Sequence, residues 1–420
     1  PTDQAHQYYN LFSDKSAYFL TWKNDGTNGK RIVEQNIINN TNNLAAENAV
    51  EKEILNLYTN SSDVGQRYSP ANDVYYSAFD LGEGWSGTPF TNPTNFSIAG
   101  LDKAVRTELA PNLEVLIQGR NIQLHQTEVL VGPNENSLRS LGTVNFEQYE
   151  SVVFSGDLEW TDVANNGNII IRLVPQAEGA DRISVSYIKI NFLRAPDLSN
   201  EAGGRLTLKP NTTGSSYLQL LNTNSTARLY RVDNFNEPIL LRSNRVGADI
   251  NTVIENTFNG ADLFLQNQNF LKPSIKKVSF RDYDNVNPDY VILSHPDLSS
   301  PSGEYNDPVK AYATYRNSAE GGAYDTLIVN INRLYDQFNY GETSPLAVYR
   351  FTQYLVENTK AEMVFIIGKG LNWTHNYYRR NEIPNTLYNE YVPTAGSPGS
   401  DILFGFDLKE NNRAAISFGR

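Results

Sequence analysis

Gly368-Lys369-Gly370 follows the apolar run MVFII, where a buried strand is expected to end. A lysine between two glycines at a strand end suggests a loop that binds phosphate groups. Such a loop also needs a glycine five residues before the glycine that precedes the lysine, and a Ser or Thr directly after the lysine. Met363 and Gly370 occupy those positions, so the spacing argues against a phosphate loop. Two interpretations of Lys369 remain, a solvated charge at the strand end and a residue of a binding site.

A second residue that could do chemistry is His295, which follows the apolar run DYVILS at residues 289–294. His295 could act as a general base, with the nearby carboxylate of Asp297 as the group that orients it. No motif places a Ser or Cys nucleophile nearby, so a structural histidine at a strand end is the favoured interpretation. His375 lies in an aromatic run and is interpreted as a surface or packing residue.

Oxygen side chains alternate in DYDNVNPD at residues 282–289, as they do at the start of a calcium loop. The run lacks the mid-loop glycine and the late glutamate of such loops, so a turn before a strand is favoured. A structural calcium ion on other carbonyl-rich loops stays open, and no other cofactor is expected. The four histidines have no metal-binding spacing, so the metal ligands, if any, are unknown from the sequence.

The composition excludes several classes of function. The 420 residues include no cysteine, so the chain has no disulfide, zinc–thiolate site or thiol nucleophile. The net charge is −12 and no basic run exceeds two residues, which argues against nucleic acid and anionic membrane surfaces as partners. No stretch approaches 18 apolar residues, so no transmembrane segment is expected. The first residue is Pro1, and we expect a processed or engineered start.

Tryptophans in the first half of the chain raise a further alternative. Trp22, Trp85 and Trp160 could stack on sugar rings, which would make a glycan the ligand. Packing in a protein core explains most tryptophans, and we favour that interpretation for these three.

Residues 1–196 are predicted to form a β-sandwich or jelly roll, because β-branched and aromatic runs alternate with Gly, Pro and Asn turns. One run, residues 43–58, has helical spacing of apolar residues and is predicted to be a helix. The predicted strands are residues 16–22, 73–81, 112–120, 125–132, 149–158, 168–175 and 182–194.

Two further domains are predicted. Residues 194–204 have the composition of a linker, and residues 204–273 are predicted to form a small β domain. From residue 274, strands and helices alternate, which predicts an α/β module with a parallel sheet and right-handed crossovers. Its predicted helices begin at Asp307-Pro308 and Ser344-Pro345, pairs of N-cap and N1 residues. Its predicted strands are residues 289–294, 325–330, 361–368 and 414–419, and its predicted helices are residues 306–322 and 344–359.

The α/β module resembles the gingipain-type cysteine peptidases, a family that includes the type IX secretion sortase of Bacteroidetes. The resemblance covers the last third of the chain and implies a caspase-like fold. Each motif alone is weak, and their order along the chain is what is specific. The matching stretches are DYVILSHPDL (289–298), YATYRNSAEG (312–321), INRLYDQFNYGETSPLAVYRF (331–351), VFIIGKG (364–370), EIPNTLY (382–388), PGSDILF (398–404) and AAISFGR (414–420).

The chain departs from the family in two ways. The family's catalytic histidine and cysteine follow the Ile-Gly-Arg strand, and this sequence stops at Arg420, on the stretch that matches it. We therefore expect an N-terminal portion that is itself inactive. Arginine-specific members have Gly-Asp where this chain has Gly368-Lys369, so arginine specificity is not expected. Lys369, Asp401 (which matches the family's Ser-Asp) and His295 are the candidate substrate-pocket residues, and no residue is assigned as catalytic.

Two functions remain open at this point. The first is part of a secreted gingipain-like cysteine peptidase or sortase-like protein, located in the periplasm, on the outer membrane or outside the cell, with a peptide or protein substrate. The second is a non-enzymatic protein whose β-sandwich binds a glycan or a cell-surface protein. A carbohydrate-active enzyme would need two carboxylates at a set separation, which a sequence cannot place.

Overall fold

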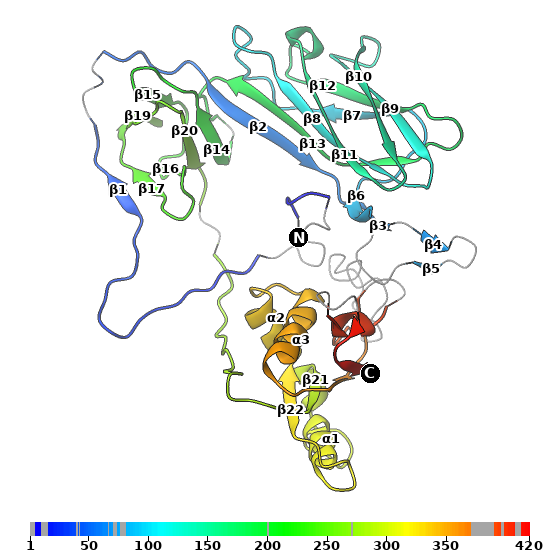
Figure 1. Cartoon of the computed structure of the whole chain (residues 1–420). Helices are drawn as coiled ribbons and strands as arrows, with labels where there is room; N and C mark the ends of the chain where they lie inside the picture. Colours follow the sequence, from blue (N-terminus) through cyan, green and yellow to red (C-terminus); the bar gives the residue numbers. More distant parts are fainter. Residues whose placement is uncertain are drawn as a thin grey trace. The chain divides into compact units, whose positions relative to one another are not determined.

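The computed structural model describes residues 5–9, 16–38, 41, 43–65, 67–69, 74–75, 81–199, 201–269, 272–370, 390–395, 399–407 and 413–420. The chain divides into two compact units (Figure 1). The β unit comprises Trp22–Ser61 and Ser86–Ser274, and the α/β unit comprises Pro1–Thr21, Ser62–Trp85 and Ile275–Arg420. The mostly β first part and the parallel α/β sheet agree with the predicted fold class.

The β unit is built from three sheets. The largest has nine strands in the order β1 (Val33–Gln35), β17 (Ile239–Leu241), β16 (Arg228–Arg231), β20 (Ala261–Gln266), β14 (Gly203–Leu208), β2 (Val50–Leu57), β13 (Ile183–Arg194), β8 (Asn112–Gly119) and β11 (Ser151–Asp157). The second has the order β10 (Arg139–Glu147), β9 (Leu124–Gly132), β12 (Ile169–Pro175) and β7 (Thr94–Ile98). The third has the order β15 (Ser215–Leu220), β19 (Asp249–Glu255) and β18 (Asn244–Val246).

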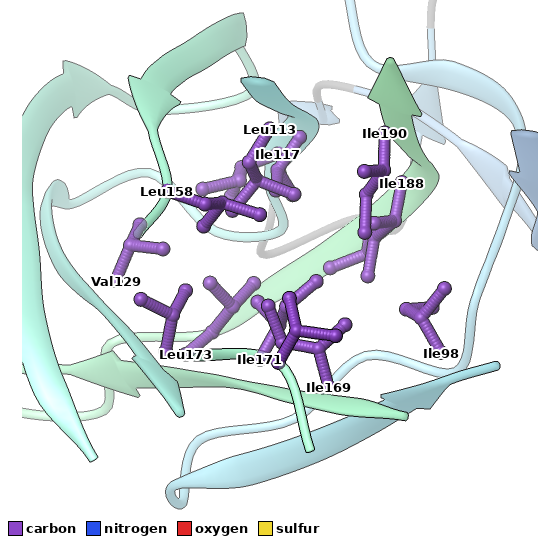
Figure 2. Close-up of a cluster of buried hydrophobic side chains, with 14 of the residues drawn as sticks. Ile98, Leu113, Ile117, Val129, Leu158, Ile169, Ile171, Leu173, Ile188 and Ile190 are labelled. Atoms are coloured by element: carbon purple, nitrogen blue, oxygen red, sulfur yellow. The ribbon is translucent and has the colours of Figure 1, made fainter. Parts of the chain in front are cut away.

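Two separate hydrophobic cores stabilise the β unit. In the first, side chains of β8 and β13 face side chains of β9, β12 and β7, as in a two-sheet sandwich (Figure 2). Leu113, Ile117 and Ile171 are fully buried there. In the second, Leu218 and Ile250 of the three-stranded sheet pack with Leu263 of β20. The predicted sandwich is therefore present, and the boundary predicted near residues 196–204 remains a prediction.

The predicted helix at residues 43–58 is wrong, because residues 50–57 form strand β2. Eight residues of β2 pair antiparallel with β13, from Val50 opposite Arg194 to Leu57 opposite Tyr187. The gain from these ladder hydrogen bonds and from sheet packing outweighs a local helix preference. Residues 16–22 form no strand and expose Tyr18 and Leu20, and the predicted strand at residues 73–81 lies largely outside the described residues.

The stretch predicted as a linker, residues 194–204, is held by ionic hydrogen bonds. Lys103 Nζ donates to the carbonyls of Asp197 and Ser199 over 3.0 and 2.8 Å. The buried guanidinium of Arg194 pairs with Glu201 and also donates to the carbonyl of Asp197. These contacts lie between the two cores, so they fix the path of the chain from one core to the other.

Hydrogen bonds within this network lower the pKa of the Asp197 carboxylate. This carboxylate accepts hydrogen bonds from the side-chain amide of Asn222 and from the backbone N–H of Ser199. These bonds lower its pKa to about 2, and the bond from Asn222 has the larger effect. Because these donors stabilise the charged form, the carboxylate supports folding while it is ionised.

We predict that Asp197→Asn lowers the stability of the β unit at pH 5 to 7 and not at pH 2. The folded pKa lies below the unfolded value, so the contribution is complete above about pH 4 and is lost as the pH falls through about 2. Acid titration of the unfolding free energy of both proteins measures this. A constant difference between wild type and variant from pH 7 to pH 2 would contradict it, and Asn222→Ala should raise the measured pKa of Asp197.

A buried ion pair anchors one end of the sandwich. His125 on β9 and Asp181 are both buried, and Nδ1 lies 2.6 Å from Oδ1 of Asp181. Nε2 lies 2.8 Å from the carbonyl oxygen of Gln148. Since a carbonyl oxygen can only accept, Nε2 donates to Gln148, and the short contact on the other side is one hydrogen bond between Nδ1 and Oδ1 of Asp181. Gly119 makes the arrangement possible, because a Cβ there would lie 1.7 Å from the Gln148 oxygen.

The second carboxylate oxygen of Asp181 completes the anchor. It accepts backbone N–H groups of Gln126, Gln176 and Ala177 over 3.3, 3.2 and 3.0 Å. The loop after β12 is thereby tied to β9 by one carboxylate. Fully satisfied buried charges of this kind are costly to break, because one partner is left uncompensated.

We predict that Asp181→Asn destabilises the β unit by about 3 kcal/mol, because the amide replaces one partner of a buried, short hydrogen-bonded pair. Hydrogen exchange at core amides of β8 measures the unfolding free energy of this unit. Glu178→Gln is the matched control, since it removes one exposed carboxylate from the same loop. Equal exchange in the two variants would mean that the pair contributes nothing.

The α/β unit contains a four-stranded parallel sheet in the order β22 (Thr326–Asn330), β21 (Tyr290–Ser294), β23 (Met363–Ile367) and β26 (Ser417–Gly419). Helices α2 (Ile331–Phe338) and α3 (Leu346–Asn358) cover one face, around Val291, Leu293 and Phe351. Helix α1 (Pro308–Asn317) packs on the other face against Tyr290 and Ile292. The parallel sheet predicted from the strand–helix alternation is confirmed.

Helix boundaries differ in detail from the prediction. Asp307 caps α1 as predicted, accepting the N–H of Lys310 over 3.0 Å, but the helix ends at Asn317 rather than at the predicted residue 322. Helix α3 begins at Leu346 with Pro345 at its N-cap, one residue later than predicted. Helix α2 was not predicted.

The smaller elements are η1 (Trp160–Asp162), η2 (Pro296–Ser299), η4 (Ile402–Gly405) and the paired strands β3 (Ser61–Val64) with β6 (Glu83–Ser86), β4 (Arg67–Ser69) with β5 (Val74–Tyr75), and β24 (Phe406–Asp407) with β25 (Arg413–Ala414).

Candidate functional site

The candidate site lies at one edge of the parallel sheet. Strands β21, β23 and β26 run in the same direction, so the residues that follow them come together at their carboxyl ends. His295 follows β21, Gly368 follows β23, and Arg420 follows β26. In open parallel sheets this edge is where ligands are usually bound.

Close packing explains the two glycines around Lys369. Gly368 has a φ of +137°, and a Cβ there would lie 3.1 Å from both Leu298 and Tyr391. A Cβ on Gly370 would lie 2.4 Å from the Thr394 side chain. The carbonyl of Lys369 accepts the N–H of Tyr391 over 3.0 Å. Close packing against segment 391–394 therefore explains why both positions are glycine. The side chain of Lys369 between them is half-buried.

His295 begins the short helix η2. Its Nδ1 accepts the N–H of Asp297 over 3.2 Å, and the Asp297 carboxylate lies 3.5 Å from the same nitrogen. These contacts conflict, since the first needs a bare Nδ1 and the second favours a protonated one. We favour the first, because the carboxylate is two-thirds exposed and therefore well solvated. The imidazole ring lies 5.4 Å from the Tyr391 ring.

Asp401 is paired with Arg420. The guanidinium donates from Nε to Oδ2 over 2.7 Å and from Nη2 to Oδ1 over 2.6 Å, a bidentate arrangement. Nη1 donates to the carbonyl of Val392 over 2.9 Å, and Nη2 to that of Pro393 over 3.1 Å. A longer contact of 3.5 Å from Nη1 reaches the carbonyl of Gly368. Both charged side chains are at least four-fifths buried.

The three predicted pocket residues are thus linked through shared neighbours. Tyr391 contacts the ring of His295 and donates to Lys369, while Arg420 joins Asp401 to the Gly368 carbonyl. Sequence reasoning did not single out Tyr391 or Arg420. Arg420 belongs to a motif that was recognised, AAISFGR, but nothing in a sequence reveals which oxygens an arginine will meet. His375 lies outside the described residues.

The calcium interpretation of residues 282–289 gains no support from the local hydrogen bonds. Oδ1 of Asp282 accepts the N–H of Asp284, and Oδ1 of Asn287 accepts that of Lys360 over 2.7 Å. The segment is thus a turn before β21, as favoured. Within the described ranges, no group of three or more metal-binding side chains could hold an ion.

The three tryptophans differ in their surroundings. Trp85 is buried, and Trp160 donates its indole N–H to the carbonyl of Glu108 while the Arg106 guanidinium lies over its ring. Trp22 is exposed. Packing therefore explains Trp85 and Trp160 without a sugar.

We predict that Gly368→Ala destabilises the α/β unit by about 1–2 kcal/mol, because the new Cβ meets an unfavourable φ and two close neighbours. Gly303→Ala is the control, since Gly303 also has a positive φ but a Cβ there would meet no atom within 4 Å. Hydrogen exchange at β23 amides gives both free energies. A smaller loss for Gly368→Ala than for the control would show that the packing against Tyr391 is not tight.

Comparisons with known proteins agree with this fold. A model of peptidase family C25 matches residues 283–420. Dimeric latent PorU from Porphyromonas gingivalis matches with a TM-score of 0.53 and 12% identity, over 93% of this chain and 38% of the PorU chain. This chain therefore spans less than half of the length of PorU. At 12% identity, the likeness concerns the fold.

Smaller structures match more weakly. Two CBM36 carbohydrate-binding modules match 33% of this chain with 12% and 13% identity and TM-scores of 0.20 and 0.19. They are covered over 95% and 98% of their lengths, and one comes from a xylanase of the hindgut metagenome of Trinervitermes trinervoides. Scores this low support no inference about this chain. No curated protein matches it. Residues 283–420 thus match peptidase family C25, the gingipain family that the sequence motifs indicate, and the chain has the fold of the corresponding part of PorU.

Proposed function

We propose that these residues form the N-terminal part of a gingipain-like or PorU-like cysteine peptidase or transpeptidase that acts on peptide or protein substrates. The observation that carries the proposal is the family C25 match to residues 283–420, together with a sheet edge at which three predicted pocket residues share neighbours. The sheet edge supplies the substrate-binding side of the site, and the catalytic pair belongs to a longer protein.

The proposed chemistry is acyl transfer through a thioester. A cysteine thiolate activated by histidine attacks the carbonyl carbon of a peptide, a C–S bond forms, and the C–N bond breaks. The leaving amine takes its proton from the histidine. Water, or the amine of an acceptor in a transpeptidase, then gives a proton to the histidine and attacks the thioester carbonyl, so that a C–O or C–N bond forms, the C–S bond breaks and the thiolate is regenerated. The 420 residues contain no cysteine, so by themselves they perform none of these steps.

Lys369 is proposed to face the substrate side chain at this edge. Asp401 is engaged by Arg420 in a bidentate pair, so a basic substrate side chain would have to displace an arginine to reach it. An ammonium at Lys369 repels Arg and Lys side chains and attracts carboxylates. The proposed substrate therefore carries an acidic or neutral side chain at the position that Lys369 meets.

Export from the cytoplasm is part of the proposal. It follows from the resemblance to secreted peptidases, and the location is the periplasm, the outer membrane or the cell surface. In the parts of the chain that the structure covers, no helix is long and apolar enough to cross a membrane.

We predict that the protein encoded by the complete reading frame hydrolyses or transfers peptides, and that a thiol-alkylating reagent abolishes this. The assay uses a fluorogenic peptide library in which the recognised side chain is varied. The 420-residue chain is the inactive reference. Two results would contradict the proposal: a complete protein that turns over no peptide, or one whose peptide turnover persists after alkylation. Either would leave ligand binding by the β-sandwich as the alternative.

In the same assay, Lys369→Asp should shift the preference toward Arg and Lys side chains by about tenfold or more. Lys360→Asp is the matched control, because Lys360 precedes β23 and Lys369 follows it, so the two charges lie at opposite ends of one strand. An equal shift in both variants would mean that long-range charge, and no local contact, sets the preference.

A further inference from the structure

We propose that Arg420 is a positioning residue of the candidate site. Its guanidinium, the carboxylate of Asp401 and the carbonyls of Gly368, Val392 and Pro393 form what we call the Arg420 clamp. The clamp holds the 368–370 loop against segment 391–394 and thereby sets the position of Lys369. Its role toward a substrate rests on the proposed function, whereas its effect on the loop does not.

The geometry of the clamp requires an arginine. Guanidinium has five N–H donors in a planar fork, and here its three nitrogens donate to five oxygens from three separate segments. An ammonium group has three donors on one atom and cannot span a carboxylate and two carbonyls in that plane. The charge alone is therefore not what the site uses.

The clamp adds to the backbone contacts between two segments of the sheet edge. Segment 391–394 reaches the 368–370 loop through the N–H groups of Tyr391 and Val392, which share the carbonyl of Lys369 at 3.0 and 3.4 Å. The Val392 side chain is fully buried in the core. The carbonyl oxygen of Val392 accepts a hydrogen bond from the Arg420 guanidinium. Val392 is thus fixed from both sides, and losing Arg420 frees the carbonyl side.

Asp401 orients the clamp. Its carboxylate lies at the N-cap position of η4 without capping that helix, so its hydrogen-bonding capacity is directed at Arg420. Gly405 at the end of η4 packs against the Ile416 carbonyl just before β26, where a Cβ would lie 2.4 Å away. This close backbone approach helps to place Asp401 near Arg420.

Hydrogen exchange at the amides of Tyr391 and Val392 tests the clamp directly, because these amides bond to Lys369. In Arg420→Lys, which keeps the charge, we expect both to exchange about tenfold faster or more, while β23 core amides stay within about twofold. Arg413→Lys is the matched control, an exposed arginine on the neighbouring β25. Unchanged exchange at Tyr391 and Val392 would overturn the proposal, as would an equal acceleration throughout the unit.

A second variant covers the case in which Arg420→Lys does not fold. Asp401→Asn keeps the arginine but removes its counter-charge, and the same two amides should exchange faster. In the complete protein, Arg420→Lys should raise KM for the preferred peptide and leave kcat within about twofold, because only the binding loop is displaced. If exchange responds and no peptide is turned over, the proposed function fails while the clamp stands.

Discussion

Parallel pairing of β21, β23 and β26 is the constraint from which the candidate site follows. Residue for residue, Val291 lies opposite Val364, and Val364 lies opposite Phe418, so the three strands end at nearly the same level. Whatever follows them must share a small volume. The chain fills that volume with glycines, a tyrosine and an ion pair, and the close approach of backbone segments leaves little room for other side chains. The candidate site is thereby confined to a few residues that the rest of the unit supports.

Much of this arrangement could be predicted from the sequence, and the reasons are local. The apolar runs of β21, β22 and β23 are short and buried, with helices between them, which fixes strand direction through the crossover rule. Asp307-Pro308 marks a helix start by its own chemistry. The strand at residues 50–57 was missed because its apolar spacing also fits a helix, and the partner that decides the matter, β13, is far away in the sequence.

The site was less predictable than the fold. His295, Lys369 and Asp401 could be named because they stand at strand ends or in a family motif. Tyr391 could not, since its role depends on contacts with His295 and Gly368 that no spacing encodes. The same holds in the β unit, where the His125–Asp181 pair and the contacts of Lys103 join residues far apart in the chain. Such polar networks are specified by tertiary structure, and a single sequence shows only their members.

The Asp401–Arg420 interaction organises the sheet edge, and a double-mutant cycle with Asp401→Asn and Arg420→Gln tests this most directly. The unfolding free energy of the α/β unit is read from exchange of the Val364 and Ile366 amides in β23. We predict a coupling energy of about 1 kcal/mol or more, as for a bidentate, mostly buried pair. Additive effects of the two substitutions, within about 0.3 kcal/mol, would contradict the claim.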